Sequence, residues 1–167
     1  MGEQARGELR EYIADNIAGP YMRLGKGFTS MAGNMNPQEV TRTYIDDSTS
    51  TVTTGFQPEW PVEGNIYTGD PANELLYKKT WHMAKGDDAI VYLVRVQMWE
   101  DGTINTDAKK SKRYMCNWAP ASDGGGAGGE DNTFSGSLKA KGDPVYGESE
   151  IAVDTGTGFE TCDFTPD

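Results

Sequence analysis

The 167-residue sequence has few of the residues on which metal centres and disulfide scaffolds depend. His82 is its single histidine, so neither a zinc site made of histidines nor a histidine-centred triad with a second, orienting imidazole can form. Two cysteines, Cys116 and Cys162, have neither metal-ligand nor redox spacing. We interpret both as thiols, with one disulfide bridge as the alternative, and we expect no metal and no cofactor.

Positive charge is also scarce. The chain has 26 acidic and 15 basic residues, which gives a formal net charge of −11. Affinity for nucleic acid and for anionic lipid increases with the number of Lys and Arg contacts, so tight binding to either is disfavoured. Apolar residues make up 36% of the chain, which is typical of an acidic folded protein rather than a disordered one.

Long apolar runs are absent. The first residues, MGEQARGELREYIADN, lack the apolar core of a signal peptide, and no stretch approaches the ~18 apolar residues of a membrane span. We therefore expect no membrane anchor and folding in a cytoplasm. The length favours one domain. We divide the chain into an N-terminal arm (1–18), a β domain (19–154) and a C-terminal tail (155–167).

Most of the chain has strand chemistry, with Thr, Val, Tyr and Ile in short runs broken by Gly, Pro, Asn and Asp. The run 89–100, AIVYLVRVQMWE, begins apolar on both faces and should be a central strand, paired as a hairpin with 109–118. Segments 133–141 and 145–153 should form another hairpin-like pair. The Thr-rich runs 40–46 and 48–56 are only weakly apolar, which favours edge positions or burial against another subunit.

One helix is predicted at 70–86, DPANELLYKKTWHMAKG, with Asp70 as cap, Pro71 at its first position and Gly86 as its stop. It should span about four turns and present one stripe of side chains, formed by Leu75, Leu76, Thr80 and Met83. His82 lies near its end, where it can interact favourably with the helix dipole. One helix against some eight strands indicates a mainly β fold, a β-sandwich or barrel with one flanking α-helix.

The glycine run 124–129, GGGAGG, has the composition of a phosphate-binding loop but not its pattern. Such a loop continues into a Lys and a hydroxyl at a helix start, whereas Glu130 and Asp131 follow here and lead into a strand. We interpret the run as a mobile, solvent-facing connector. The acidic residues at the helix ends do not match a calcium loop, and nothing in their spacing selects a pair for glycoside cleavage. We expect no catalytic residues and no enzymatic activity.

One segment of this acidic chain is strongly basic, the cluster KKSKR at 109–113. Two interpretations stay open. The cluster either blunts a solvated strand edge or complements an acidic surface of a neighbouring subunit.

Several segments together resemble the tail tube (major tail) proteins of long-tailed bacteriophages and prophages, particularly those of Gram-positive hosts. These are RLGKGFTS, then NPQ before TYIDD, TGFQPEWPVEG, the single helix, and SGSLKAKGDPV near the end. They extend over residues 21–151. The resemblance rests on their order and spacing, since none is specific alone.

The resemblance implies a structural virion protein whose β-sandwich polymerises into stacked hexameric rings, forming a tube around a tape-measure protein and ending at tail terminator and tip proteins. It implies assembly in the host cytoplasm and passage of DNA without specific binding. An acidic lumen would let DNA slide, and six copies of a chain of charge −11 would carry −66, so assembly should depend on ionic strength. We expect the hairpin 90–118 to line the lumen and the segment 29–38 to reach a neighbour. The expected intersubunit contacts are Ser30, Met31, Asn34, Met35, Asn36, Lys109, Lys110, Lys112 and Arg113.

An alternative function is a carbohydrate-binding β-sandwich module, suggested by the four Trp and eight Tyr residues. Such a module needs exposed aromatic side chains on one face. Trp60, Trp81 and Trp99 instead lie within patterned elements, so we interpret them as core.

Overall fold

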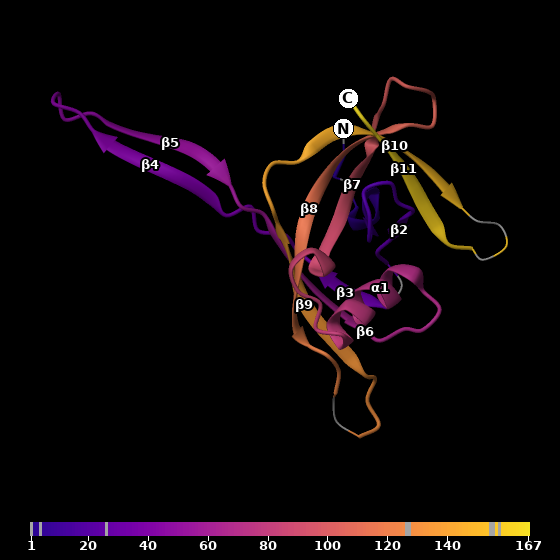
Figure 1. Cartoon of the computed structure of the whole chain (residues 1–167). Helices are drawn as coiled ribbons and strands as arrows, with labels where there is room; N and C mark the ends of the chain where they lie inside the picture. The colour runs from indigo at the N-terminus through magenta and orange to yellow at the C-terminus, as the bar shows by residue number, and fades with distance from the viewer. Residues whose placement is uncertain (1, 4, 26, 126–127, 154–155, 157) are drawn as a thin grey trace.

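The computed structural model describes residues 2–3, 5–25, 27–125, 128–153, 156 and 158–167. Eleven strands, one α-helix and two short 3₁₀ turns make up this part of the chain (Figure 1). The elements are η1 (Arg6–Glu8), β1 (Leu9–Ala14), β2 (Tyr21–Arg23), β3 (Phe28–Met31), β4 (Pro37–Thr43), β5 (Thr49–Phe56), β6 (Glu59–Asn65), α1 (Pro71–Trp81), η2 (Gly86–Ala89), β7 (Ile90–Asp101), β8 (Lys109–Ser122), β9 (Thr133–Ala140), β10 (Val145–Val153) and β11 (Glu160–Pro166).

Six strands close into a barrel in the order β10-β11-β2-β1-β7-β8, with β8 pairing back to β10. The 14-residue strand β8 makes this closure possible because one of its edges is long enough to pair with two strands, β10 and β9. Its first half, Lys109–Arg113, pairs with β10, and its second half, from Cys116 to Ser122, pairs with β9. The sheet then continues outward through β9, β6 and β3. The mainly β fold with one helix is thereby confirmed.

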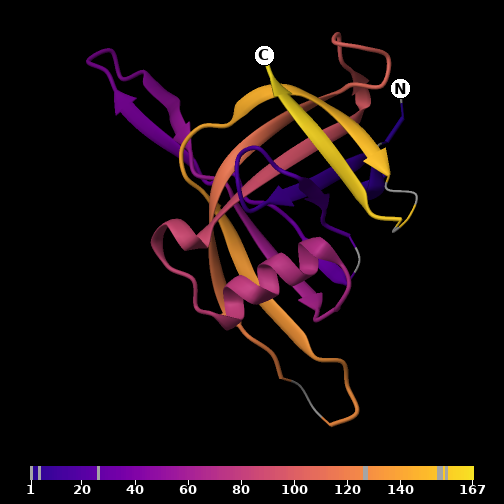
Figure 2. The same cartoon turned by 45° about the vertical axis from the view of Figure 1, so that its right-hand side comes forward.

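Two apolar cores lie on opposite faces of the central strands, because β1 and β7 alternate their side chains between them. Tyr12, Val94 and Cys162 pack inside the barrel. Ile13 and Leu93 point to the other face, into a core completed by β6, β9 and α1. The helix lies across this second core, as Figure 2 shows. The predicted hairpin β7–β8 is therefore confirmed as the centre of the fold.

The helix α1 begins as predicted and ends early. The Asp70 side chain accepts a hydrogen bond from the Asn73 backbone N–H, and Pro71 is the first helical residue. The helix stops at Trp81 with His82 as C-cap, so it has 11 residues, about three turns rather than four. Met83 has a positive φ of 50° and is 71% exposed. Its inclusion in the buried stripe was wrong, because the chain leaves the helix before reaching it.

The structure also corrects a predicted strand pair. Strands β9 and β10 follow each other in sequence but do not pair, because each adds to a different half of β8. The N-terminal segment (1–18) and the C-terminal tail (155–167), which we set apart from the β domain, also contain strands of the sheet. Residues 11–14 of β1 are buried between β2 and β7, and β11 lies between β10 and β2. Both segments contain only short apolar runs, so the sequence did not predict these strands.

The glycine-rich connector joins β8 to β9, as its position between two predicted strands indicates. Gly126 and Ala127 lie outside the described residues. At its described base, the Gly125 backbone N–H donates to the Asn132 side-chain oxygen at 2.6 Å. Gly124 and Gly125 have φ values of 135° and 121°, which only glycine adopts without strain.

Candidate assembly surfaces

Strands β4 and β5 form a separate two-stranded sheet that projects from the body as an arm (Figure 1). All seven residues of β4 are exposed, as are most of β5. At about 3.4 Å per residue, a seven-residue strand places the tip about 24 Å beyond the root. A lone two-stranded hairpin is at best marginally stable in water, so an arm of this length calls for a partner surface.

One face of the arm carries apolar side chains that nothing in the described chain covers. Val40 lies directly opposite Val52, and they are 41% and 56% exposed. They line a shallow hollow of about 200 Å³. The opposite face is held by a hydrogen bond between the Thr41 and Thr51 hydroxyls at 3.1 Å. The Thr-rich strands thus form an exposed two-stranded sheet, and burial of one face against another subunit stays a prediction.

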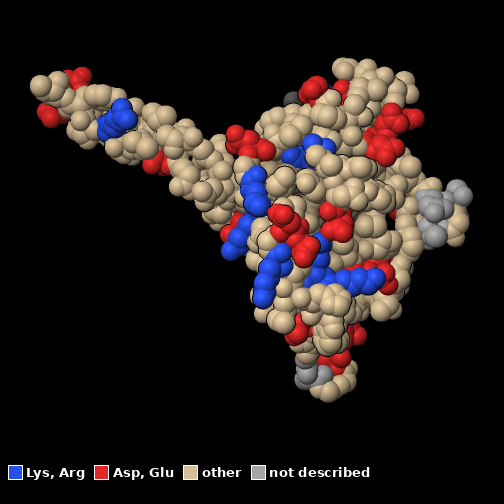
Figure 3. Space-filling model, in the orientation of Figure 1, with Lys and Arg blue, Asp and Glu red and all other residues tan. Residues whose placement is uncertain are grey.

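The tip of the arm is acidic. Figure 3 shows red acidic atoms at its end. The turn contains Asp46, whose carboxylate accepts hydrogen bonds from the Ser48 hydroxyl at 2.5 Å and from the Ser48 backbone N–H at 3.0 Å. These hydrogen bonds lower the pKa of Asp46. Asp47 has a positive φ of 65°, and its carboxylate makes no hydrogen bond or ion pair within the described residues. Ile45, which directly precedes these two acidic residues, is fully exposed.

The predicted contact residues of the segment 29–38 lie at the arm's root rather than along the arm. Ser30 and Met31 belong to β3, and Asn34 forms a bridge with Glu59. Met35 accepts a backbone hydrogen bond from the Gln57 N–H at 3.2 Å, and the Asn36 side chain donates to the Gln57 carbonyl at 3.0 Å. These bonds fix where the arm leaves the body. Whether the same residues touch a neighbour stays a prediction.

The basic cluster lies on the first half of β8, beside β7 and β10. Its four cations have different surroundings. The Lys109 ammonium pairs with Asp101 at 2.5 Å, and the Arg113 guanidinium stacks over the Phe164 ring, 4.9 Å from its centroid. Lys110 faces Glu148 across the ladder. Lys112 faces Arg95 on β7 and lies 5.3 Å from the Tyr114 ring centroid.

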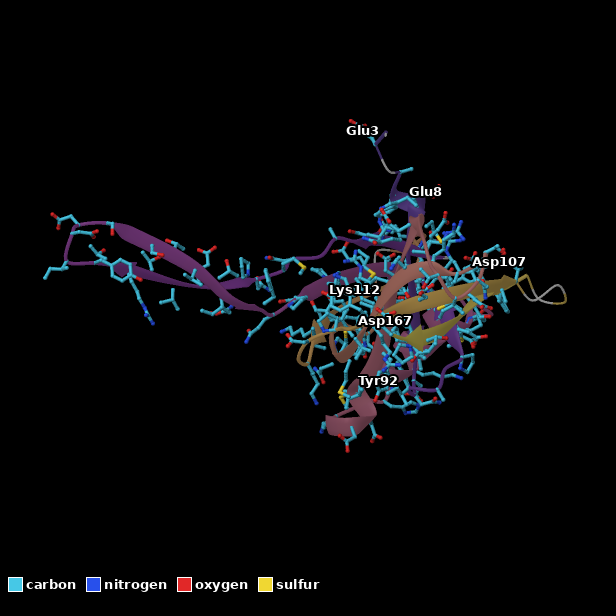
Figure 4. The ribbon with its side chains drawn as sticks, turned by 90° about the horizontal axis from the view of Figure 1, so that it is seen from above. Glu3, Glu8, Tyr92, Asp107, Lys112 and Asp167 are labelled. Atoms are coloured by element: carbon cyan, nitrogen blue, oxygen red, sulfur yellow. The ribbon has the colours of Figure 1, made fainter. Side chains whose placement is uncertain are left out.

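Next to this cluster is a cavity of about 480 Å³, which we call the cationic cavity. Its wall contains three basic side chains, Arg95, Lys110 and Lys112, and one acidic side chain, Asp167. Figure 4 shows Lys112 and Asp167 on the body, away from the arm tip. The remaining wall residues are Leu9, Gln97, Trp99, Ser111, Tyr146 and Gly147.

Half-buried ion pairs join β1, β2 and β11. Glu160 accepts hydrogen bonds from Arg10 at 2.7 Å, Arg23 at 2.8 Å and the Tyr12 hydroxyl at 2.5 Å. Burial alone would raise the pKa of Glu160, but the Tyr12 hydrogen bond and the two guanidinium groups outweigh burial and lower it. Burial and, to a smaller extent, the hydrogen bond to the same carboxylate raise the pKa of Tyr12 far above its usual value. These groups tie the first strand to the last.

A second carboxylate orders the loop between β7 and β8. Glu148 accepts hydrogen bonds from the Ile104 N–H at 3.0 Å and from the backbone and hydroxyl of Thr103. These bonds lower the pKa of Glu148. A Cβ atom at Gly102 would overlap the carboxylate, which would have to move away from its present position. The loop is held both by Glu148 of β10 and by its own turn, in which the Asn105 side-chain oxygen accepts hydrogen bonds from the Asp107 and Ala108 N–H groups at 2.9 Å.

Several sequence-based interpretations can now be compared with the structure. Cys116 and Cys162 are both free thiols, buried in opposite cores, and burial raises the pKa of each to about 12. Within the described residues, no group of three or more His, Cys, Asp or Glu side chains could hold a metal ion. No helix in the same part of the chain is long and apolar enough to cross a membrane.

The assignment of tryptophans to the core was only partly correct. Trp60 is buried, but Trp81 and Trp99 are 61% and 38% exposed. Trp81 is the last helical residue, and Trp99 lies beyond the point where β7 loses its register with β8. They belong to separate places, Trp81 beside Tyr77 on α1 and Trp99 in the cationic cavity.

The expectation that the hairpin 90–118 lines a lumen is wrong for its central part. Val91, Leu93, Val94 and Val96 are fully buried and alternate between the two cores of the same chain. The loop at the end of the hairpin is largely exposed, as are single residues along its strands such as Gln97 and Met115. The Thr-rich runs 40–46 and 48–56, for which the sequence favoured edge positions or burial against another subunit, form most of the arm, and their contact with a neighbour stays a prediction.

Solved structures with this fold come from phage-like tails. A chain in the tail of an empty GTA particle, refined with helical C6 symmetry, matches with a TM-score of 0.57 and 11% identity over 86% of this chain and 98% of that chain. A chain of the native gene transfer agent virion matches with a TM-score of 0.55 and 9% identity over 86% and 98%. The cap that terminates the anti-feeding prophage tube matches with a TM-score of 0.54 and 12% identity over 87% and 91%.

The sequence by itself matches no protein-family model and no curated protein. The likeness is therefore one of fold, at identities of 9–12%. The chain has the tail tube fold that the resemblance in its sequence implied.

Proposed function

We propose that this chain is a structural subunit of a phage-type tail tube, in which the arm of each copy joins it to another copy. The arm carries the proposal: it is a hairpin without a second layer whose apolar face includes Val40 and Val52. Burial of about 100 Å² of apolar surface per copy would contribute about 2.5 kcal/mol. Association of copies also covers the open edges of the arm.

Six copies form a ring in this proposal, and the rings stack into the tube. The C6 symmetry of the GTA tail supports this arrangement. The tube surrounds a tape-measure protein during assembly in the host cytoplasm, ends at terminator and tip proteins, and later conducts DNA. The net charge of −11 fits a conduit that does not bind the DNA passing through it. The chain acts by assembly and performs no catalysis.

Electron microscopy of the purified protein at increasing concentration and ionic strength tests this function. Salt weakens repulsion between acidic subunits, so we expect rings or tubes to increase between 0.05 and 0.5 M salt, about where the Debye length falls from roughly 14 to 4 Å. A protein that remains monomeric under every condition would refute the proposal.

The role of the arm is tested by a variant in which a Gly-Gly linker replaces residues 36–56. The ends can be joined this way because the Gln57 N–H already bonds to the Met35 carbonyl at 3.2 Å. We expect a folded monomer whose free energy of unfolding is within about 1 kcal/mol of the unmodified protein, since the arm packs on little of the body. Tubes formed by this variant would show that the arm is dispensable.

A further inference from the structure

The cationic cavity contains two basic side chains that face each other across neighbouring strands. Arg95 and Lys112 are directly opposite on β7 and β8, and like charges in this position destabilise a sheet. Glu11 compensates Arg95 in part, through an ion pair at 3.4 Å, but Glu11 also pairs with Arg6 at 3.0 Å. The ammonium of Lys112 makes no ion pair or hydrogen bond with any described residue.

A second observation concerns Arg95 itself. Its Nε atom is buried and makes no hydrogen bond within the described residues, while its guanidinium lies over the Trp60 ring at 5.5 Å. A buried donor without an acceptor is unfavourable, because it has lost its hydrogen bonds to water without replacement. Together with the uncompensated Lys112, it indicates that this cavity is built to receive an anion that the single chain does not provide.

The cavity also has an apolar side. Trp99 and Tyr146 line it and are 38% and 62% exposed. Aromatic side chains of this kind are enriched at protein interfaces. The cavity thus fits an occupant that has a carboxylate next to an apolar side chain. The carboxylate of Asp167 also lines the wall, and Lys110 faces Glu148, which leaves Lys112 and Arg95 as the cations available to the occupant.

The arm tip has this chemistry. Ile45 is fully exposed, and the carboxylate of Asp47, two residues later, has no partner among the described residues. The left-handed backbone at Asp47, with φ of 65°, belongs to a tight turn closed by a hydrogen bond from the Asp47 N–H to the Tyr44 carbonyl at 3.0 Å. The tip of a given chain does not reach its own cavity, because the arm projects away from the body in both views (Figures 1 and 4).

We propose that the arm tip of one copy, residues 44–47, docks into the cationic cavity of another copy. Asp47 pairs there with Lys112 and Arg95, and Ile45 packs between Trp99 and Tyr146. This inference rests on the proposed function and names the receiving site for the arm. It also accounts for the basic cluster on β8 as a surface complementary to an acidic neighbour.

The first test reverses the charge of the receiving site. In Lys112→Glu the new carboxylate lies opposite Arg95, so the like-charge pair disappears and the monomer remains folded. We expect the concentration required for tube formation, measured by sedimentation, to increase at least tenfold. Lys141→Glu is the matched control: it makes the same change of charge at an exposed residue outside the cavity and should change this concentration less than twofold. Equal effects of the two variants would overturn the proposal.

Exchanging the charges of the tip and the cavity provides a second test. Combining Asp47→Lys with Lys112→Glu restores opposite charges between tip and cavity. We expect the double variant to assemble at a lower concentration than either single variant. A double variant that assembles no better than the worse single variant would contradict the pairing.

Cross-linking locates the contact directly. Ile45→Cys and Tyr146→Cys are introduced together, and mild oxidation follows assembly. Cys116 and Cys162 are buried and should not react. We expect covalent ladders of three or more copies, whereas either single variant should yield dimers at most. Tubes without ladders would refute the docking site but leave the proposed function standing, whereas an unmodified protein that forms no tubes would refute both.

Discussion

Val52 in the arm and Val94 in the barrel both lie within antiparallel strands, yet Val52 is 56% exposed and Val94 is fully buried. Val94 is enclosed by residues of its own chain, including Tyr12 and Cys162. Val52 has only Val40 opposite it and a shallow hollow beside it. The same residue type therefore stabilises the monomer in one region and is available to stabilise an assembly in the other.

The hydrogen bonds of the two regions differ in the same way. In the body, ion pairs join strands that are distant in sequence, such as Glu160 with Arg10 and Arg23. In the arm, side-chain bonds are local, such as Thr41 with Thr51. Substitutions in the body should consequently affect folding, and substitutions in the arm should affect association.

The largest effect is expected in the second core. Leu93 is fully buried among residues of β6, β8 and α1. Leu93→Ala removes this packing and leaves a cavity, so we expect the free energy of unfolding to fall by about 3 kcal/mol. Urea denaturation monitored by tryptophan fluorescence would measure it. A loss below about 1 kcal/mol would mean that this core is loosely packed.

Glu160→Gln should have the next largest effect. The substitution leaves Arg10 and Arg23 without their carboxylate. We expect the free energy of unfolding to fall by about 2 kcal/mol at pH 7, a moderate loss because both arginines are partly exposed. The folded-state pKa of Glu160 is lowered, so its stabilisation is complete above its unfolded pKa of about 4.3 and disappears as the pH falls through the folded value. The difference between the two proteins should therefore shrink below about pH 4. A difference that persists unchanged at pH 2.5 would contradict this origin.

An identical substitution in both regions tests the comparison directly. Val94→Thr places a hydroxyl in a buried apolar site and should cost about 1–3 kcal/mol. Val52→Thr makes the same change on the arm and should alter monomer stability by less than about 0.5 kcal/mol. Thermal unfolding of the two monomers measures both effects. Val52→Thr should instead raise the concentration needed for assembly, and equal costs in the monomer would erase the distinction between the regions.

The smallest stability is expected within the arm itself. Its backbone amides, for example those of residues 39–43, should exchange with solvent almost freely in the monomer, because a two-stranded sheet opens locally at little cost. Amides of β7 should exchange only through global unfolding. After assembly, the arm amides should gain protection. Arm amides that exchange as slowly as those of β7 in the monomer would show that the arm is part of the cooperative unit.

The sequence was most informative where a pattern is local. The alternation along β7 and the cap at Asp70 were sufficient to predict the central hairpin and the helix. The pairing of β10 with the first half of β8 was not predictable, because neighbouring strands in sequence usually pair and nothing local reveals that β8 serves two partners. The helix end was missed for a related reason, since a positive φ at Met83 is not encoded by its residue type.

The candidate site was less accessible to sequence reasoning. The basic cluster at 109–113 was visible as a reversal of charge, but Arg95 joins it only through the register of β7 with β8. Similarly, the arm residues were recognised as weakly apolar strands, whereas their projection from the body depends on the bonds around Asn34 and Gln57. Charge and composition can be read from a short segment of sequence. The complementarity between two surfaces depends on how distant segments pair, so it could not be predicted.

The place of β11 in the barrel has a consequence for synthesis on the ribosome. This strand, Glu160–Pro166, inserts between β10 and β2 and supplies the carboxylate that Arg10 and Arg23 share. Every other barrel strand is translated before it, so a nascent chain has both flanking edges open until β11 emerges from the ribosome. A chain interrupted before β11 would therefore expose two unpaired strand edges, which can pair with other chains.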